Sequence, residues 1–224
     1  MTGKKVLITA SLILFIWSIM AYAEDKNTIK LLPPQTDGGK PLMQALKDRK
    51  SMRAFAPKEL PLQILSNLLW AACGINRPDS GGLTAPTAKN MQEIDVYVVR
   101  QEGVYLYDAK ANALIEVLAG DIRELTGKQG FVKDAPINLV YVSDLSRMGG
   151  QAAKDADFYA ATDTGFISEN VYLYCSSAGL ATVVRAWLDK AELAKTMKLK
   201  PGQRVVLAQT VGYPEEKQRR GYER

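Results

Sequence analysis

The stretch INLVYVSD, residues 137–144, is apolar at nearly every position and lacks the alternation of a half-exposed strand. This pattern predicts a β-strand that is covered on both faces. Two β-rich segments precede it, IDVYVVR (94–100) and GVYLYDA (103–109), and the two residues between them predict a hairpin. Two further strands are expected near the C-terminus, in LATVVRAWL (180–188) and RVVLAQTVGY (204–213).

Helical patterns lie among these strands. We expect four helices: residues 42–48, a helix opened by Pro61 and stopped at Gly74, residues 151–178, and residues 190–199. The third is predicted to be broken or softened near Thr164-Gly165 and to end at Gly179. Residues 76–90 predict a long irregular loop. Because strands and helices mix without a regular βαβ alternation, the sequence indicates an α+β domain around one central sheet.

The N-terminus has the order of a secretory signal. Lys4 and Lys5 precede an apolar run over residues 6–20, and Ala21-Tyr22-Ala23 offers small residues at a cleavage site. Cleavage after Ala23 is expected to leave an exported, periplasmic protein with no stable membrane span. An uncleaved anchor is the alternative, although the apolar run is short for a span of roughly 20 residues. The predicted organisation is signal 1–23, extended arm 24–41 and one domain over 42–224.

Composition excludes several classes of function. The chain has no histidine, which removes histidine-based catalytic triads and most zinc sites, so no metal is expected. Lys4 and Lys5 are the only charged residues before Glu24, so cleavage lowers the net charge from +5 to +3, too little to indicate nucleic-acid binding. Cys73 and Cys175 are expected to be buried thiols, although one disulfide is possible in an exported protein.

The stretch RKSMRAF (49–55) is a candidate anion site. Arg49, Lys50 and Arg53 surround the hydroxyl of Ser51, and such groups form charge-assisted hydrogen bonds to a phosphate. The alternative is a surface turn with solvated charges.

Two other stretches are candidates for ligand contact. In APTAKNMQ (85–92), small side chains would let a flat group approach the backbone; alternatively, Thr87 caps a helix start. Arg185 interrupts an apolar strand, so it either lies buried beside a ligand or reaches water from an edge strand. No nucleophile or acid–base pair is evident. This profile indicates an enzyme whose chemistry belongs to a bound cofactor.

These stretches, in this order, resemble the flavin-dependent nitroreductase family. The family pattern Arg-x-Ser-x-Arg/Lys-x-Phe corresponds to Arg49, Ser51, Arg53 and Phe55, and its Pro-Ser-x-x-Asn-x-Gln loop corresponds to residues 86–92, with threonine in place of serine. The segment GLATVVRAWLD and the strand end VGYP (211–214) also match. The resemblance covers roughly residues 42–220, and four loose motifs in the correct order are fairly specific.

The resemblance implies an obligate homodimer with a mostly antiparallel sheet flanked by helices and with FMN at the subunit interface. It implies ping-pong, two-electron reduction of a small nitroaromatic or quinone-like acceptor, with NAD(P)H a doubtful donor outside the cytoplasm. Other branches that oxidise azolines or dehalogenate stay open, as does an FMN carrier without turnover.

The residues implied to bind FMN fall into four groups. They are the phosphate seat Arg49, Lys50, Ser51 and Arg53; the loop of the partner subunit with Pro86, Thr87, Ala88 and Asn90; the ring-facing segment Val184, Arg185 and Ala186, which donates an N–H to the flavin; and the outlying Gln129, Arg219 and Arg220.

Overall fold

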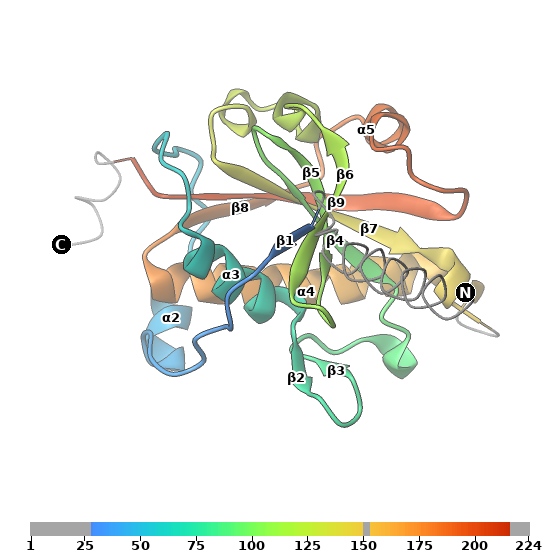
Figure 1. Cartoon of the computed structure of the whole chain (residues 1–224), viewed down its shortest axis with the longest axis horizontal. Coiled ribbons are helices and arrows are strands. Elements are labelled where there is room, and N and C mark those ends of the chain that lie inside the picture. The colour runs from blue at the N-terminus through green and yellow to red at the C-terminus, as the bar shows by residue number, and fades with distance from the viewer. Residues whose placement is uncertain (1–27, 150–152, 216–224) are drawn as a thin grey trace, which may run out of the picture.

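A seven-stranded antiparallel sheet is the centre of the fold, with strand order β1-β6-β5-β4-β7-β9-β8 (Figure 1). The computed structural model describes residues 28–149 and 153–215, so the predicted signal lies outside the described residues. The strands are β1 (Thr28–Lys30), β4 (Ile94–Val99), β5 (Gly103–Asp108), β6 (Ala113–Ala119), β7 (Ile137–Asp144), β8 (Ala181–Arg185) and β9 (Gln203–Gly212). The expected α+β architecture with an antiparallel sheet is confirmed.

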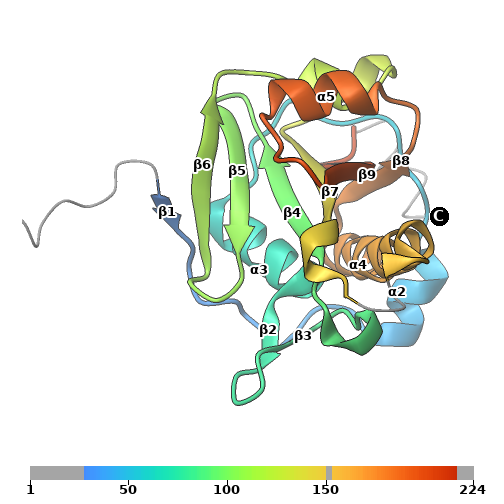
Figure 2. The ribbon, with the colours of Figure 1, turned by 90° about the vertical axis from the view of Figure 1, so that its right-hand side faces the viewer.

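Strand β7 has the double-sided burial that its sequence predicts. Leu139 and Tyr141 lie in the core cluster shared with two long helices, whereas Val140 and Val142 lie in a second cluster on the opposite face. The helices are α2 (Leu42–Asp48), α3 (Leu62–Cys73), α4 (Ala156–Ala178) and α5 (Lys190–Thr196). Figure 2 shows α5 on one side of β7 and β9, and α4 on the other. The sheet around β7 is therefore the middle layer of the molecule, with α4 on one face and α5 on the other.

The prediction of a break in the long helix is wrong. Helix α4 is continuous over 23 residues, because the side chain of Thr164 is fully buried and packing holds the helix where intrinsic propensity is weak. Its end is as predicted, since Gly179 adopts the left-handed conformation with φ 70° and ψ 28°. Among the described residues no helix has the length and apolarity to span a bilayer.

Four of the strands in the described residues were not predicted. Strand β6 pairs with β5, and the N-terminal arm contributes β1, which pairs with β6 at one edge of the sheet. The loop expected over residues 76–90 contains a hairpin of β2 (Ile75–Arg77) and β3 (Gly82–Leu83), which projects from the body of the molecule (Figure 1).

Both cysteines are free and buried, as the first of the two alternatives predicted. Burial raises the pKa of Cys73 to about 12 and raises that of Cys175 further, so neither thiol is ionised at neutral pH.

Candidate functional site

The cationic stretch 49–53 lies along the outer edge of β8. The backbone N–H of Met52 donates to the carbonyl of Thr182 at 3.0 Å, and the side chain of Met52 is buried. Its neighbours Ser51 and Arg53 are exposed. The stretch is therefore held to the sheet through one residue while its polar side chains face solvent, as an anion site requires.

Tyr172 of α4 provides a second connection between the cationic stretch and β8, in addition to the bond between Met52 and Thr182. The hydroxyls of Ser51 and Tyr172 are 2.8 Å apart, and the backbone N–H of Val184 donates to the same Tyr172 hydroxyl at 3.0 Å. The guanidinium of Arg49 lies over the Tyr172 ring, 5.3 Å from its centroid. Tyr172 was not predicted from the sequence, because it lies in a helix that is apolar on most sides.

The loop 85–92 has a strained backbone. Lys89, Asn90 and Gln92 have φ between 50° and 55°, a left-handed conformation that non-glycine residues seldom adopt. The Thr87 hydroxyl accepts the N–H of Gln92 at 3.1 Å, so Thr87 closes the loop around a short 3₁₀ turn, although it makes no helix-capping bond. Such strain clusters at functional sites, where the surroundings hold it in place.

The buried carboxyl group of Asp163 holds this loop to α4, and a second buried carboxyl group, that of Glu93, interacts with Asp163. The N–H of Ala88 donates to Asp163 Oδ2 at 2.9 Å. Glu93 is fully buried, and neither of its carboxyl oxygens has a partner among the described residues. Burial, and then the carboxyl of Asp163, raises the pKa of Glu93 to about 7, whereas the charge of Arg147 lowers it.

The loop and the cationic stretch contact different parts of the same helix. The N–H of Ala88 donates to Asp163, whereas the hydroxyl of Ser51 contacts that of Tyr172. Tyr172 lies nine positions after Asp163 in α4, which corresponds to roughly 13 Å along the helix. One chain therefore does not bring its own loop 85–92 to its own cationic stretch.

Arg185 lies inside the molecule although its strand is at the edge of the sheet. Its side chain is 5% exposed, and its Nη2 donates to Asn138 Oδ1 and to Thr210 Oγ1, each at 2.7 Å. Nη1 donates to the carbonyl of Thr126 at 2.5 Å. No carboxylate pairs with it among the described residues, and burial lowers its pKa to about 10. Of the two interpretations, the solvated edge arginine is wrong.

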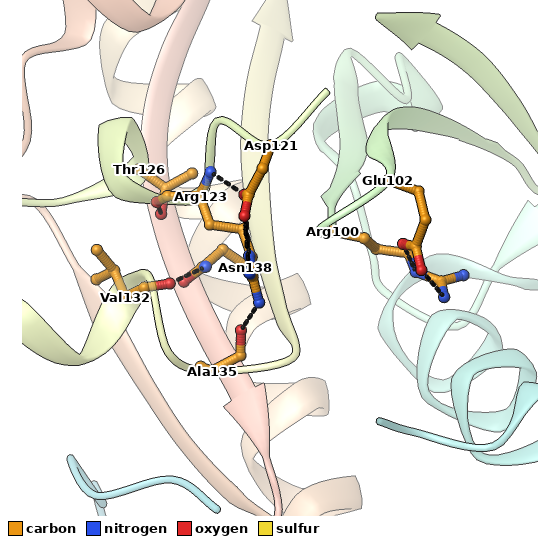
Figure 3. A network of polar contacts seen from close by, with 8 residues as sticks. All are labelled: Arg100, Glu102, Asp121, Arg123, Thr126, Val132, Ala135 and Asn138. Carbon is orange, nitrogen blue, oxygen red and sulfur yellow. Dashed lines mark hydrogen bonds and ion pairs between the residues drawn. The ribbon is translucent and has the colours of Figure 1, made fainter. Parts of the chain in front are cut away.

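The segment that packs over Arg185 is itself held by polar contacts. Arg185 bonds both Thr126 and Asn138, and Figure 3 shows Asn138 Nδ2 donating to the carbonyl of Val132 at 2.7 Å. In the same view, Arg123 bonds both the Asp121 carboxylate and, at 3.0 Å, the carbonyl of Ala135. These contacts fix residues 121–135 over the end of β8.

Gln129 adds an unpartnered acceptor beside this cluster. Its Oε1 is buried and has no hydrogen-bond partner among the described residues. A Cβ at Gly127 would lie 2.1 Å from Arg185 Nη1 and 2.7 Å from Gln129 Oε1, so only glycine leaves room for both groups. An orphaned amide oxygen of this kind suits a hydroxyl-bearing ligand.

The described residues thus place the cationic stretch along β8, bonded at Thr182, and Gln129 near Arg185 at the end of that strand. Arg219 and Arg220 lie outside the described residues. No group of three or more possible metal ligands occurs within residues 28–149 and 153–215. Exposed cations and an unpartnered acceptor beside one edge strand together fit a phosphorylated, hydroxylated cofactor.

This fold and site define a class of α+β proteins that bind a cofactor at the edge of the sheet. The nitroreductase family model matches residues 46–213, and the chain belongs to the nitroreductase family of flavin oxidoreductases.

Known proteins are similar to this chain, in sequence or in fold, over most of its length. A protein of Methanocaldococcus jannaschii that carries the name of a nitroreductase is 32% identical over 170 residues, covering 71% of this chain and 85% of that protein. A crystal structure from Ralstonia eutropha, described as a nitroreductase, is 42% identical with a TM-score of 0.82 and covers 87% of this chain and 92% of that one. An NADPH:FMN oxidoreductase of Vibrio harveyi, complexed with NAD⁺, shares the fold at 18% identity with a TM-score of 0.56, covering 78% of this chain and 69% of that one.

Proposed function

We propose that this protein is an FMN-dependent oxidoreductase that reduces a small, planar nitroaromatic or quinone-like acceptor by two electrons. The observation that carries the proposal is the cationic stretch 49–53, bound to the outer edge of β8 through Met52 and Thr182. When bound, FMN would supply the two-electron chemistry of a ping-pong cycle, in which donor and acceptor use the same site in turn.

Each part of the site then has a distinct role. Arg49, Lys50, Ser51 and Arg53 would hold the phosphate, and Gln129 would accept a hydrogen bond from the ribityl chain. Since the Val184 N–H is already bonded to Tyr172, the next N–H on the same edge of the strand, that of Ala186, is the expected donor to the ring. Such a donor stabilises the negative charge that develops on a reduced ring.

The partner subunit is expected to complete the site. Because loop 85–92 and the cationic stretch lie far apart along α4, the loop of one subunit would cover the ring held by the other. The family's homodimeric assembly supports this arrangement. Pro86, Thr87, Ala88 and Asn90 would then contact the ring from across the interface.

We further propose that the protein is exported, and that its natural donor is not NAD(P)H. The proposed signal over residues 1–23 supports export, and nicotinamide donors are scarce outside the cytoplasm. Rapid-mixing spectroscopy tests this idea. Reduction of the loaded protein by NADPH alone at about 10 per second, a typical enzymatic turnover, would contradict it, as would a cytosolic protein with its signal intact.

Binding of FMN is the first experiment. Titration of the protein with FMN, followed by quenching of flavin fluorescence, is expected to saturate at one FMN per subunit. Failure of the well-folded protein to bind FMN would overturn the proposal. After stoichiometric reduction, rapid reoxidation by a quinone indicates an enzyme, whereas slow reoxidation with ready exchange of FMN indicates a carrier.

A further inference from the structure

Tyr172 lies where the cationic stretch meets the edge strand. Its side chain is 6% exposed, and its hydroxyl contacts both Ser51 Oγ, at 2.8 Å, and the N–H of Val184, at 3.0 Å. The phosphate seat and the ring-facing strand of the proposed function therefore share one phenolic oxygen, and the inference below rests on that function.

The direction of these hydrogen bonds depends on what occupies the seat. A backbone N–H can only donate, so Tyr172 accepts from Val184. Between Tyr172 and Ser51, either hydroxyl can be the donor. When an anion accepts the single proton of Ser51, that proton is no longer available to Tyr172, and Tyr172 must donate to Ser51.

An occupied seat thus imposes one orientation on the whole chain. It runs from the N–H of Val184 to the hydroxyl of Tyr172, then to the hydroxyl of Ser51 and finally to the phosphate oxygen. Hydrogen bonds aligned in this way polarise and strengthen one another, and Tyr172, in the middle of this chain, is buried. The bond between Met52 and Thr182 holds the two segments at the necessary separation.

We propose that Tyr172 is a positioning residue that couples the phosphate seat at Ser51 to the backbone of β8 at Val184. Filling the seat strengthens the hydrogen bond that holds the ring-facing edge. A flavin with a phosphate therefore receives a better-ordered strand than a flavin without one, beyond the direct contacts of the phosphate itself.

A double-mutant cycle tests the coupling. Tyr172→Phe, Ser51→Ala and the double variant are titrated with FMN and with riboflavin, which lacks the phosphate. Since one lost hydrogen bond in a charged network weakens binding by about tenfold, we expect each single variant to bind FMN about tenfold more weakly and the double variant no more than about twentyfold. With riboflavin, Ser51→Ala is expected to have no effect and the cycle to be additive.

The helix offers a matched control. Tyr174, two residues further on, directs its hydroxyl to the carbonyl of Ile64 in α3, so Tyr174→Phe removes a phenolic hydroxyl without touching the seat. FMN affinity in this variant is expected to equal that of the parent. A hundredfold loss of FMN affinity in the Tyr172/Ser51 double variant, which is the product of the two single effects, would overturn the coupling. The parent would still bind FMN in that case, so the proposed function would stand.

A second measurement does not depend on the folding of Tyr172→Phe. Amide hydrogen exchange at Val184 is compared in the parent protein with FMN, with riboflavin and with inorganic phosphate. FMN and phosphate are expected to slow exchange several-fold more than riboflavin does, and Ser51→Ala should abolish the difference. Equal protection by FMN and riboflavin in the parent would contradict the proposal.

Discussion

At the scale of single residues, the two arginines of the stretch 49–53 give the most direct test of the phosphate seat. Charge-assisted hydrogen bonds contribute about 1.5–3 kcal/mol each, so Arg49→Ala combined with Arg53→Ala is expected to weaken FMN binding about a thousandfold in a folded dimer. Isothermal titration measures the change.

Two controls accompany this double variant. Riboflavin should bind the variant and the parent equally, because it has no phosphate to lose. Arg204→Ala removes a surface cation that pairs with Asp157 near the opposite end of α4, and it should leave FMN affinity unchanged. Unchanged FMN affinity in the double variant would remove the assignment of the seat.

Arg185 is expected to matter for stability as well as for redox behaviour. Arg185→Ala leaves the buried carbonyl of Thr126 without its donor and removes one of the two donors to Asn138 Oδ1, at a cost of about 3 kcal/mol. Thermal unfolding followed by circular dichroism should show a melting temperature lower by roughly 6–12 °C. FMN is expected to be retained, with a changed midpoint potential. An unchanged melting temperature would contradict the structural role.

At the scale of elements, Glu93, which directly follows loop 85–92, makes the stability of the folded chain sensitive to pH. The pKa of Glu93 in the folded protein is raised from 4.5 to about 7, so the folded state keeps a proton that the unfolded state releases. Stability is therefore expected to fall as pH rises from about 4.5 to about 7, by at most about 3 kcal/mol. Glu93→Gln removes this loss and should be the more stable protein at pH 8.

Urea unfolding at pH 5 and pH 8 checks the prediction. Glu124 is an exposed carboxylate of the segment over Arg185, and Glu124→Gln should keep the pH dependence of the parent. A Glu93→Gln variant whose stability still falls between pH 5 and pH 8 would show that other groups carry the effect; Asp163 and Arg147 are the charged groups that act on Glu93.

The elements that the sequence predicted are those with unambiguous local signals. Strand β7 is apolar throughout, and Pro61 and Gly179 mark a helix start and a helix end by their backbone chemistry. Strand β6, ALIEVLA, was missed because alanine, leucine and glutamate favour helices, and only its pairing with β5 makes it a strand.

The candidate site was predictable only in part, for a related reason. Arg49, Ser51 and Arg53 form a local motif, which one stretch of sequence displays. The contact of Ser51 with Tyr172 and the burial of Arg185 depend on which elements meet in space. A single sequence contains no local sign of such contacts.

At the scale of the whole molecule, the exposed apolar side chains of α2 and α4 are expected to form the dimer interface. Leu42, Met43 and Leu46 of α2 and Phe158 and Phe166 of α4 are all exposed. Because α2 leads directly into Arg49, loss of the dimer should also weaken FMN binding.

Met43→Asp is expected to convert the dimer to a monomer, since a charge would have to be buried without a partner. Light scattering coupled to size-exclusion chromatography measures the mass. Val117 lies on β6, near the edge of the sheet opposite to β8, and is another exposed apolar residue. Val117→Asp introduces the same charge there and should leave the dimer intact. A dimeric Met43→Asp variant would place the interface elsewhere.

The position of β9 affects the order in which this protein can acquire its structure. The last strand in the sequence, Gln203–Gly212, lies between β7 and β8 rather than at an edge. A growing chain that has not yet reached residue 203 has no partner for β8, and the outer edge that meets Met52 cannot form. The sheet can therefore be completed only after its last strand has been synthesised, through contacts between segments that are distant in sequence.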